Sequence, residues 1–249
     1  MLIIEVIIIL IDKFSMSVND NLLFAKRNIV DSIYKEAKLE GIAVTYPDTN
    51  EIFNGRTVAG LSVDDTIKIN NLKHAWEFVL TTLDYPISLR YIRQINSEIG
   101  RGIVFREGIL RDADVSIGGT SWKPDIPNEN KVEGFIEDII KNTDNSATDR
   151  AVDTMLYVMR SQLFFDGNKR TAQLLANKIM IENGVGIISI PVEDQREFMN
   201  LLIDFYETNN SDTIKEFVYE RCIDGYGIGG RPVVQDDELD TTIQDNNRK

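Results

Sequence analysis

Residues 157–184 constrain the fold of this 249-residue chain more than any other stretch, because their pattern predicts two helices joined by one tight turn. Apolar side chains recur at helical spacing on both sides of residues 166–168. Asp166 and Asn168 are residue types that cap helices, and Gly167 accepts the positive φ that a tight turn demands. Gly184 is placed to end the second helix. We therefore expect a helix–turn–helix unit here.

The start of the second helix has the features of an anion-binding site. Its free backbone N–H groups and its dipole favour negative charge, and Gly167 lets a ligand approach the backbone. Lys169 and Arg170 place two cations in the first turn, where the dipole alone disfavours them, so a bound phosphate would explain their presence. Asp166 supplies a hard oxygen suited to the Mg²⁺ that accompanies polyphosphates. The alternative is an ordinary helix start with a solvated charged face.

The same residues resemble the signature of the Fic/Doc (Fido) family, H-x-F-x-[D/E]-G-N-[G/K]-R. Phe164 and residues 166–170 match it in order. The resemblance implies ATP and Mg²⁺ as cofactors and transfer of AMP to a hydroxyl group of a target protein, or of the terminal phosphate in Doc-like members. It assigns Mg²⁺ to Asp166 and the nucleotide to Gly167, Asn168, Lys169 and Arg170.

Two positions depart from the family pattern. Gln162 stands at the histidine position, where the family histidine takes the proton from the target hydroxyl. A glutamine amide cannot accept that proton near neutral pH, whereas an imidazole with a pKa of about 6.5 can. Gln173 stands at the second arginine position and removes one phosphate partner. His74, the only histidine of the chain, lies in a distant helical segment and is interpreted as a surface or packing residue.

The rest of the chain predicts a mainly α fold, a Fic/Doc-like helical bundle with a small β-hairpin flap. Apolar spacing predicts helices over residues 19–40, 62–80, 86–100, 132–140, 198–206 and 213–222, and a further helix from Ala147 into the stretch at 157–184. We expect four regions: an apolar N-terminal extension (1–18), N-terminal helices (19–85), the Fido core (86–224) and an acidic, disordered tail (225–249). Residues 1–15 form either a strand or a packed extension, or natural translation begins at Met16.

The end of the first long helix resembles the inhibitory segment of Fic proteins, [S/T]-x-x-x-E-[G/N]. Glu40 and Gly41 fit that pattern, which implies that Glu40 reaches the active site and pairs with the second arginine. Glu36 replaces the leading Ser or Thr, and Gln173 replaces the arginine partner. An amphipathic packing helix alone is the alternative interpretation of this segment.

A Gly-Gly pair between two short runs predicts a hairpin over residues 115–122. In the family, a flap at this place aligns the target protein by strand addition. The resemblance assigns that role to Ile117, Gly118, Gly119 and Thr120. A plain structural hairpin is the alternative.

Composition narrows the classes of function. The net charge of −13 argues against a general nucleic-acid binder. The apolar N-terminal run is too short to span a membrane, so we expect no membrane segment. A single cysteine, Cys222, excludes an internal disulfide and suits a reducing cytoplasm. We expect no zinc site, because cysteine and histidine do not cluster.

Three functions fit the sequence: a working Fic-type transferase, a degenerate Fic protein that binds nucleotide or a partner and acts as a regulator, and a structural remnant without nucleotide affinity. Persistence of the phosphate-binding residues favours the first two. Positioning and charge stabilisation supply most of the catalysis in phosphoryl transfer, so loss of the base need not abolish it.

Overall fold

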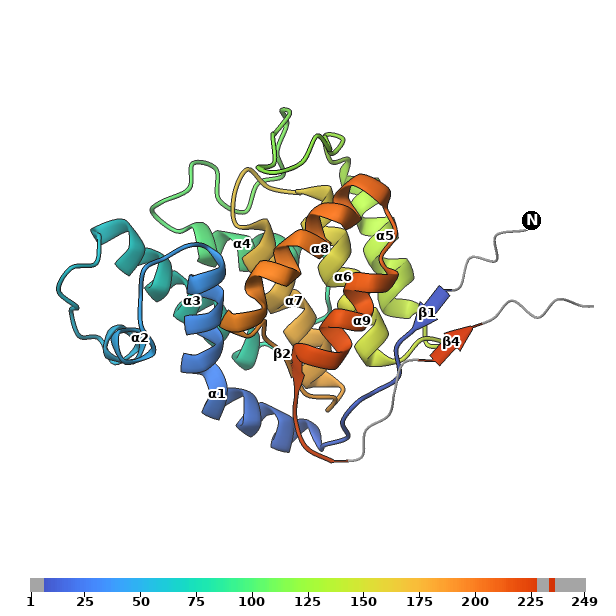
Figure 1. Ribbon diagram of the computed structural model, residues 1–249, viewed down its shortest axis with the longest axis horizontal. Helices are drawn as coiled ribbons and strands as arrows, with labels where there is room; N and C mark the ends of the chain where they lie inside the picture. Colours follow the sequence, from blue (N-terminus) through green and yellow to red (C-terminus); the bar gives the residue numbers. More distant parts are fainter. Residues whose placement is uncertain (1–6, 228–232, 236–249) are drawn as a thin grey trace, which may run out of the picture.

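The computed structural model of the chain describes residues 7–227 and 233–235, and within them the protein is mainly helical, as predicted (Figure 1). The helices are α1 (Val18–Leu39), α2 (Tyr46–Phe53), α3 (Val63–Thr81), α4 (Leu89–Gly100), α5 (Glu129–Lys141), α6 (Ala147–Ser161), α7 (Asn168–Glu182), α8 (Gln195–Thr208) and α9 (Asp212–Arg221), with the 3₁₀ turn η1 (Val192–Asp194) before α8. Two antiparallel pairs of short strands complete the fold: β1 (Ile7–Ile9) with β4 (Val233–Gln235), and β2 (Ile187–Ile188) with β3 (Ile223–Asp224).

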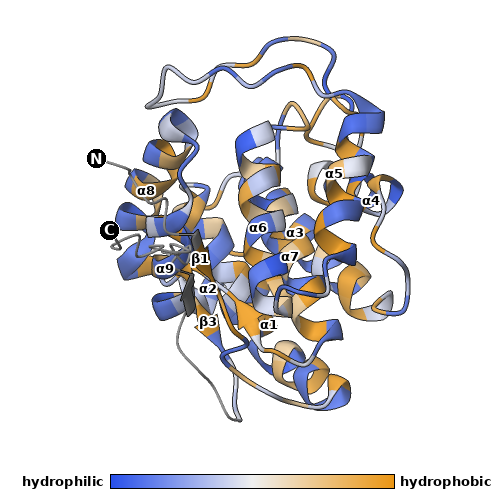
Figure 2. Cartoon of the chain, turned by 90° about the vertical axis from the view of Figure 1, so that its right-hand side faces the viewer, coloured by the Kyte–Doolittle hydropathy of each residue, from blue (hydrophilic) through white to orange (hydrophobic). Residues whose placement is uncertain are grey.

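Helix α7 is the central element, and α1, α3, α4 and α6 pack around it (Figure 1). Of its 15 residues, 13 are buried, so it has no solvent face like that of an amphipathic surface helix. The other helices carry hydrophobic stripes beside hydrophilic ones (Figure 2). Gly184 ends the helix with φ +73°, and a Cβ there would lie 2.1 Å from the Met16 carbonyl oxygen. The chain that leads into α1 therefore crosses the end of α7 at a place that requires glycine.

Serine caps fix the starts of four helices. The side chains of Ser17, Ser62, Ser88 and Ser146 accept hydrogen bonds from the first turns of α1, α3, α4 and α6. The predicted start at Pro86 is three residues too early, because the cap at Ser88 begins α4. Helix α2 was not predicted, although a capping box between Thr45 and Asp48 signals its start.

The described part of the N-terminal extension packs against the core. Leu10 is fully buried, and its backbone N–H donates to Asp149 Oδ1 at 3.0 Å. Lys13 Nζ donates to the Tyr219 carbonyl at 2.9 Å. These contacts agree with the packed-extension interpretation. Residues 1–6 of the extension, and the predicted tail apart from residues 225–227 and 233–235, lie outside the described residues. No helix among the described residues has both the length and the apolar character to cross a membrane.

The hairpin predicted over residues 115–122 forms its turn but not its strands. Gly119 has φ +85°, yet none of these residues, all of which the structure describes, lies in a strand. One backbone group that could pair across the hairpin bonds elsewhere, because Ser121 N donates to Glu207 Oε1 at 2.7 Å. The Thr120 hydroxyl also donates to this carboxylate. An isolated two-stranded hairpin is marginal in water, so these contacts with α8 prevail.

Candidate functional site

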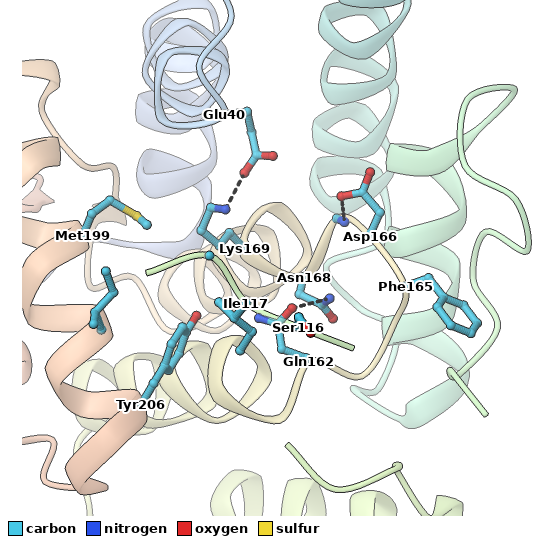
Figure 3. Close-up of a pocket in the computed structure, with 13 residues that line it drawn as sticks. Glu40, Ser116, Ile117, Gln162, Phe165, Asp166, Asn168, Lys169, Met199 and Tyr206 are labelled. Atoms are coloured by element: carbon cyan, nitrogen blue, oxygen red, sulfur yellow. Dashed lines mark hydrogen bonds and ion pairs between the residues drawn. The ribbon is translucent and has the colours of Figure 1, made fainter. Parts of the chain in front are cut away.

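A pocket of about 200 Å³ lies at the start of α7, between the end of α1, the 115–122 segment and α8 (Figure 3). It is lined by Glu40, Ser116, Ile117, Gly118, Gln162, Phe165, Asp166, Gly167, Asn168, Lys169, Met199, Ile203 and Tyr206. The pocket is smaller than the roughly 300–1,000 Å³ usual for a small-molecule site. Part of the space at this helix start is thus taken by the protein's own side chains.

The turn that begins α7 provides no N-cap side chain for the first turn of the helix, and the Gly167 N–H donates to Asp166 Oδ1. Gly167 occupies the N-cap with φ +78°, and no side chain of the described chain caps this helix. Asn168 instead stabilises the turn from within, because its Oδ1 accepts from Phe164 N at 2.9 Å and its Nδ2 donates to Phe164 O at 2.8 Å. Asn96 Nδ2 donates to the Asp166 carbonyl at 2.9 Å and fixes the turn from outside. The turn before α7 is therefore held in a fixed shape from two sides.

Lys169 and Arg170 both face a carboxylate that comes from a distant part of the sequence. Lys169 Nζ lies 3.3 Å from Glu40 Oε1, and Arg170 Nη2 lies 3.4 Å from Glu40 Oε2. The Arg170 side chain is only 3% exposed. Its Nε and Nη1 are buried without a hydrogen-bond partner among the described residues. A buried guanidinium with unused N–H groups retains capacity for a further anion.

Glu40 is thus placed where its predicted role requires, but with a different partner. It follows the last residue of α1, and Gly41 turns the chain with φ +78°. The inhibitory pattern pairs the glutamate with the second arginine, whereas here Glu40 pairs with Lys169 and Arg170. Gln173, at the second arginine position, is 1% exposed and outside the pocket lining.

Asp166 meets the requirement for a Mg²⁺ ligand that works together with phosphate oxygens. Its carboxylate is 56% exposed, and its Oδ1 accepts from Gly167 N at 2.6 Å and lies 3.2 Å from Arg170 Nη2. The described residues contain no group of three or more acidic, cysteine or histidine side chains that could hold a metal by themselves. A lone carboxylate fits the usual mode of Mg²⁺, which keeps several waters and takes its other ligands from the substrate.

Gln162 lies beside the turn that precedes α7, and both ends of its side-chain amide already make hydrogen bonds (Figure 3). It ends α6 in the left-handed conformation, with φ 45° and ψ 60°. Its Nε2 donates to Met159 O at 2.6 Å, and its Oε1 accepts from Asn168 Nδ2 at 3.1 Å. The Tyr206 hydroxyl also bonds Gln162, while burial raises the pKa of Tyr206. The amide is fixed by its neighbours, and neither it nor Tyr206 acts as a base near neutral pH.

Sequence comparison with family models matches residues 86–180 to the Fic/DOC family. These residues belong to the Fic/DOC family. The family segment contains α4, the 115–122 segment, α5, α6 and most of α7, which together carry every predicted site residue except Glu40. No curated protein sequence matches the chain.

Solved structures show the same fold. A Fic domain-containing signaling protein from Bacteroides thetaiotaomicron has a TM-score of 0.68 at 19% identity, over 82% of this chain and 84% of that one. Fic-1 from C. elegans (residues 134–508) has a TM-score of 0.64 at 21% identity, over 81% of this chain and 65% of that one. A Fic family protein from Desulfovibrio desulfuricans has a TM-score of 0.65 at 15% identity, over 79% of this chain and 62% of that one. The likenesses extend beyond the family segment to most of this chain.

Within the Fic/DOC fold, the flap residues divide into two pairs. Ile117 and Gly118 line the pocket, whereas Gly119 packs near Ile203 of α8 and Thr120 bonds Glu207. His74 is exposed and outside the pocket lining, in agreement with its interpretation as a surface residue.

The sequence did not point to Arg111, which ties the flap to the end of α6. Arg111 is 1% exposed, and its Nε donates to the Gln162 carbonyl at 2.6 Å. It also donates to the carbonyls of Ala113 at 2.9 Å and Pro124 at 3.0 Å, on the two sides of the flap. Desolvation by burial lowers its pKa. An arginine in a loop gives no sequence signal that it will be buried, so this role emerges only from the structure.

Proposed function

We propose that this protein binds Mg-ATP at the start of α7 and transfers AMP, or the terminal phosphate, to a hydroxyl group of a target protein. The observation that carries the proposal is Arg170, a buried cation in the first turn of a helix without an N-cap side chain, with two guanidinium nitrogens, Nε and Nη1, unused. Membership of residues 86–180 in the Fic/DOC family supports the same chemistry.

The candidate site residues then have defined tasks. Gly167 and Lys169 line the pocket, and Arg170 is buried next to Lys169 in the first turn of α7. The Gly167 backbone, Lys169 and Arg170 would hold phosphate oxygens, and Asn168 keeps the turn in its shape. Asp166 would hold Mg²⁺, which neutralises charge on the phosphates when it is bound. Ile117 and Gly118, on the pocket wall, would align the segment of the target protein that carries the hydroxyl.

The reaction proceeds without a general base. The hydroxyl oxygen bonds to the α-phosphorus as pyrophosphate leaves, or to the γ-phosphorus as ADP leaves. Gln162 holds no proton-accepting group, so the hydroxyl proton passes to solvent or to the phosphate, and positioning and charge stabilisation provide the acceleration. General-base catalysis is worth roughly 10²–10⁴-fold, so we expect transfer to be slower than in a protein with histidine at this position by about that factor. Glu40 slows it further while it pairs with Lys169 and Arg170.

A second function is a catalytically silent Fic protein that binds nucleotide and regulates a partner. The hydrogen bonds of Gln162 with Met159 and Asn168 favour this regulatory function, because both ends of the amide are already used and neither is left to bind an incoming hydroxyl. This function keeps the phosphate site and Mg²⁺ but requires no turnover.

Label transfer to protein tests both functions. The chain and its Gln162→His variant are incubated with Mg²⁺ and either α-labelled or γ-labelled ATP, with host lysate as the source of targets. We expect the native chain to label protein weakly and Gln162→His to label it about 10²–10⁴-fold faster. The label that moves identifies AMP or phosphate transfer.

The controls separate the outcomes. Labelling by Gln162→His alone supports the regulator, and absence of ATP binding at millimolar concentration in both proteins excludes both functions. Asp166→Ala should lose the Mg²⁺-dependent part of ATP binding, while Asp144→Ala, an exposed acid outside the pocket, should not.

A further inference from the structure

Glu36 is a buried acid in the last part of α1. It lies one helical turn before Glu40 on the inner face of α1 and is 2% exposed. Its Oε1 accepts from Trp76 Nε1 at 3.0 Å, and its Oε2 is buried without a hydrogen-bond partner among the described residues. A buried acid with an unsatisfied oxygen is costly unless it is neutral or acquires a partner.

Arg170 has unused hydrogen-bond donors, whereas Glu36 has an unused acceptor. Its Nη2 serves Glu40 and Asp166, while its Nε and Nη1 remain unpaired in the same interior. Within the described chain, the charged groups that act on the Glu36 carboxyl are Arg170 from α7 and Glu40 from its own helix. Helix α3 faces it with the neutral Trp76 indole, and α2 and η1 contribute no charge to it.

We propose that Glu36 is a proton-linked positioning residue for Arg170. While Glu36 is protonated, Arg170 is available to an anion in the pocket, either Glu40 or a phosphate group. When Glu36 loses its proton, the new carboxylate pairs with the unused N–H groups of Arg170 and reduces the hold of the guanidinium on that anion. The part of this inference that concerns phosphate rests on the proposed function; the part that concerns Glu40 does not.

The electrostatics set the pH at which the change occurs. Burial raises the pKa of Glu36 from its ordinary value of 4.5 to about 8, and repulsion from Glu40 adds to the rise. The hydrogen bond from Trp76 and the charge of Arg170 oppose it. Glu36 is therefore neutral at pH 7 and ionises as the pH rises through about 8. Both the Glu40 contact and phosphate binding should weaken in the same interval.

Nucleotide binding tests the part of the inference that concerns phosphate. The dissociation constant for Mg-ATP is measured by calorimetry from pH 6.5 to 9.5 for the native chain, Glu36→Gln and, as a control, Glu137→Gln on the exposed face of α5. Glutamine keeps the oxygen that accepts from Trp76 but cannot ionise. We expect affinity to fall about tenfold above pH 8 in the native chain and Glu137→Gln, and less than twofold in Glu36→Gln. Any titration of ATP itself affects the three proteins equally. Parallel plots of the dissociation constant against pH for the three proteins would therefore overturn the proposal.

A measurement without ligand tests the part of the inference that concerns Glu40. The stability lost on Glu40→Gln substitution is measured by urea unfolding at pH 6.5 and 9.5, in the native background and in Glu36→Gln. The loss should shrink at pH 9.5 in the native background and stay constant in Glu36→Gln. Equal losses at both pH values in both backgrounds would overturn the inference. If no protein binds Mg-ATP but the Glu40 losses differ as expected, the proposed function fails and the linkage of Glu36 to Arg170 stands.

Discussion

Arg170 is one buried side chain that pairs with two carboxylates of the candidate site. Its guanidinium is 3% exposed and shares Nη2 between Glu40, at 3.4 Å, and Asp166, at 3.2 Å. Glu40 reaches it from a helix end 130 positions earlier in the sequence. Under the proposed function the same cation is also a phosphate partner, so Glu40 and the nucleotide would compete for it. Such competition would set how tightly ATP binds without altering the residues that contact it.

Removal of the Glu40 charge should therefore raise nucleotide affinity. In Glu40→Gln the helix end is kept, but Lys169 and Arg170 lose their carboxylate partner. We expect Mg-ATP to bind about tenfold more tightly, which corresponds to about 1.4 kcal/mol. Calorimetric titration measures it. Glu51→Gln removes an equal charge from an exposed ion pair with Arg56 and should leave the affinity unchanged. Equal affinities for Glu40→Gln and the native chain would contradict a Glu40 restraint.

At the scale of elements, the flap is held by side chains rather than by a strand ladder. Glu207 of α8 accepts from Ser121 N at 2.7 Å and from the hydroxyls of Thr120 and Ser121. These hydrogen bonds lower the pKa of Glu207, so the carboxylate stays charged at neutral pH. Arg160 of α6 lies 3.7 Å from the centre of the Trp122 ring and anchors the far side. The flap is positioned by two helices that flank the pocket.

Glu207→Gln should loosen the flap without unfolding the bundle. An uncharged amide accepts more weakly from Ser121 N, so we expect the exchange of that amide hydrogen to quicken several-fold. Hydrogen–deuterium exchange followed by mass spectrometry of peptides over residues 113–125 measures the change. Glu216→Gln, on an exposed part of α9, removes the same charge and should leave those peptides unchanged. Unaltered exchange in Glu207→Gln would assign the flap's order to Arg111 and Arg160.

At the scale of the whole molecule, one buried ion cluster joins three distant segments. Lys215 of α9 lies 2.7 Å from Asp149 and 2.9 Å from Asp153, both on α6. Asp149 also accepts from the backbone N–H of Leu10 at 3.0 Å. Burial raises the pKa of Asp153. Desolvation by itself would lower the pKa of Lys215, but the charges of Asp153 and Asp149 raise it. The N-terminal extension, α6 and α9 are thereby linked through Asp149 and its partner Lys215.

Lys215→Met should destabilise the entire fold. The substitution keeps the apolar stem but leaves buried Asp149 without its cation, and breaking a buried pair typically costs about 3–5 kcal/mol. Urea denaturation at pH 7 measures the loss, which we place near the lower end, about 3 kcal/mol, because Asp153 is partly exposed. Lys141→Met removes an exposed partner of Glu137 and should cost less than about 0.5 kcal/mol. Similar losses in the two variants would show that the cluster contributes little.

What the sequence by itself determined follows local rules. Helical spacing, serine caps and the glycine at residue 167 act within a few positions of one another, so the helices and the turn at the start of α7 could be predicted. The missed helix α2 carried a local signal too, the capping box of Thr45 and Asp48.

Only the tertiary structure decided which distant groups meet. It gave Glu40 the partners Lys169 and Arg170 in place of residue 173, and it buried Glu36 one helical turn before Glu40. It bonded the flap to Glu207 instead of closing a hairpin, and it buried Arg111 beneath the flap. The physical reason is the same throughout: these outcomes depend on which charges and backbone groups lose their water together, and such desolvation is a property of packed helices rather than of neighbouring residues.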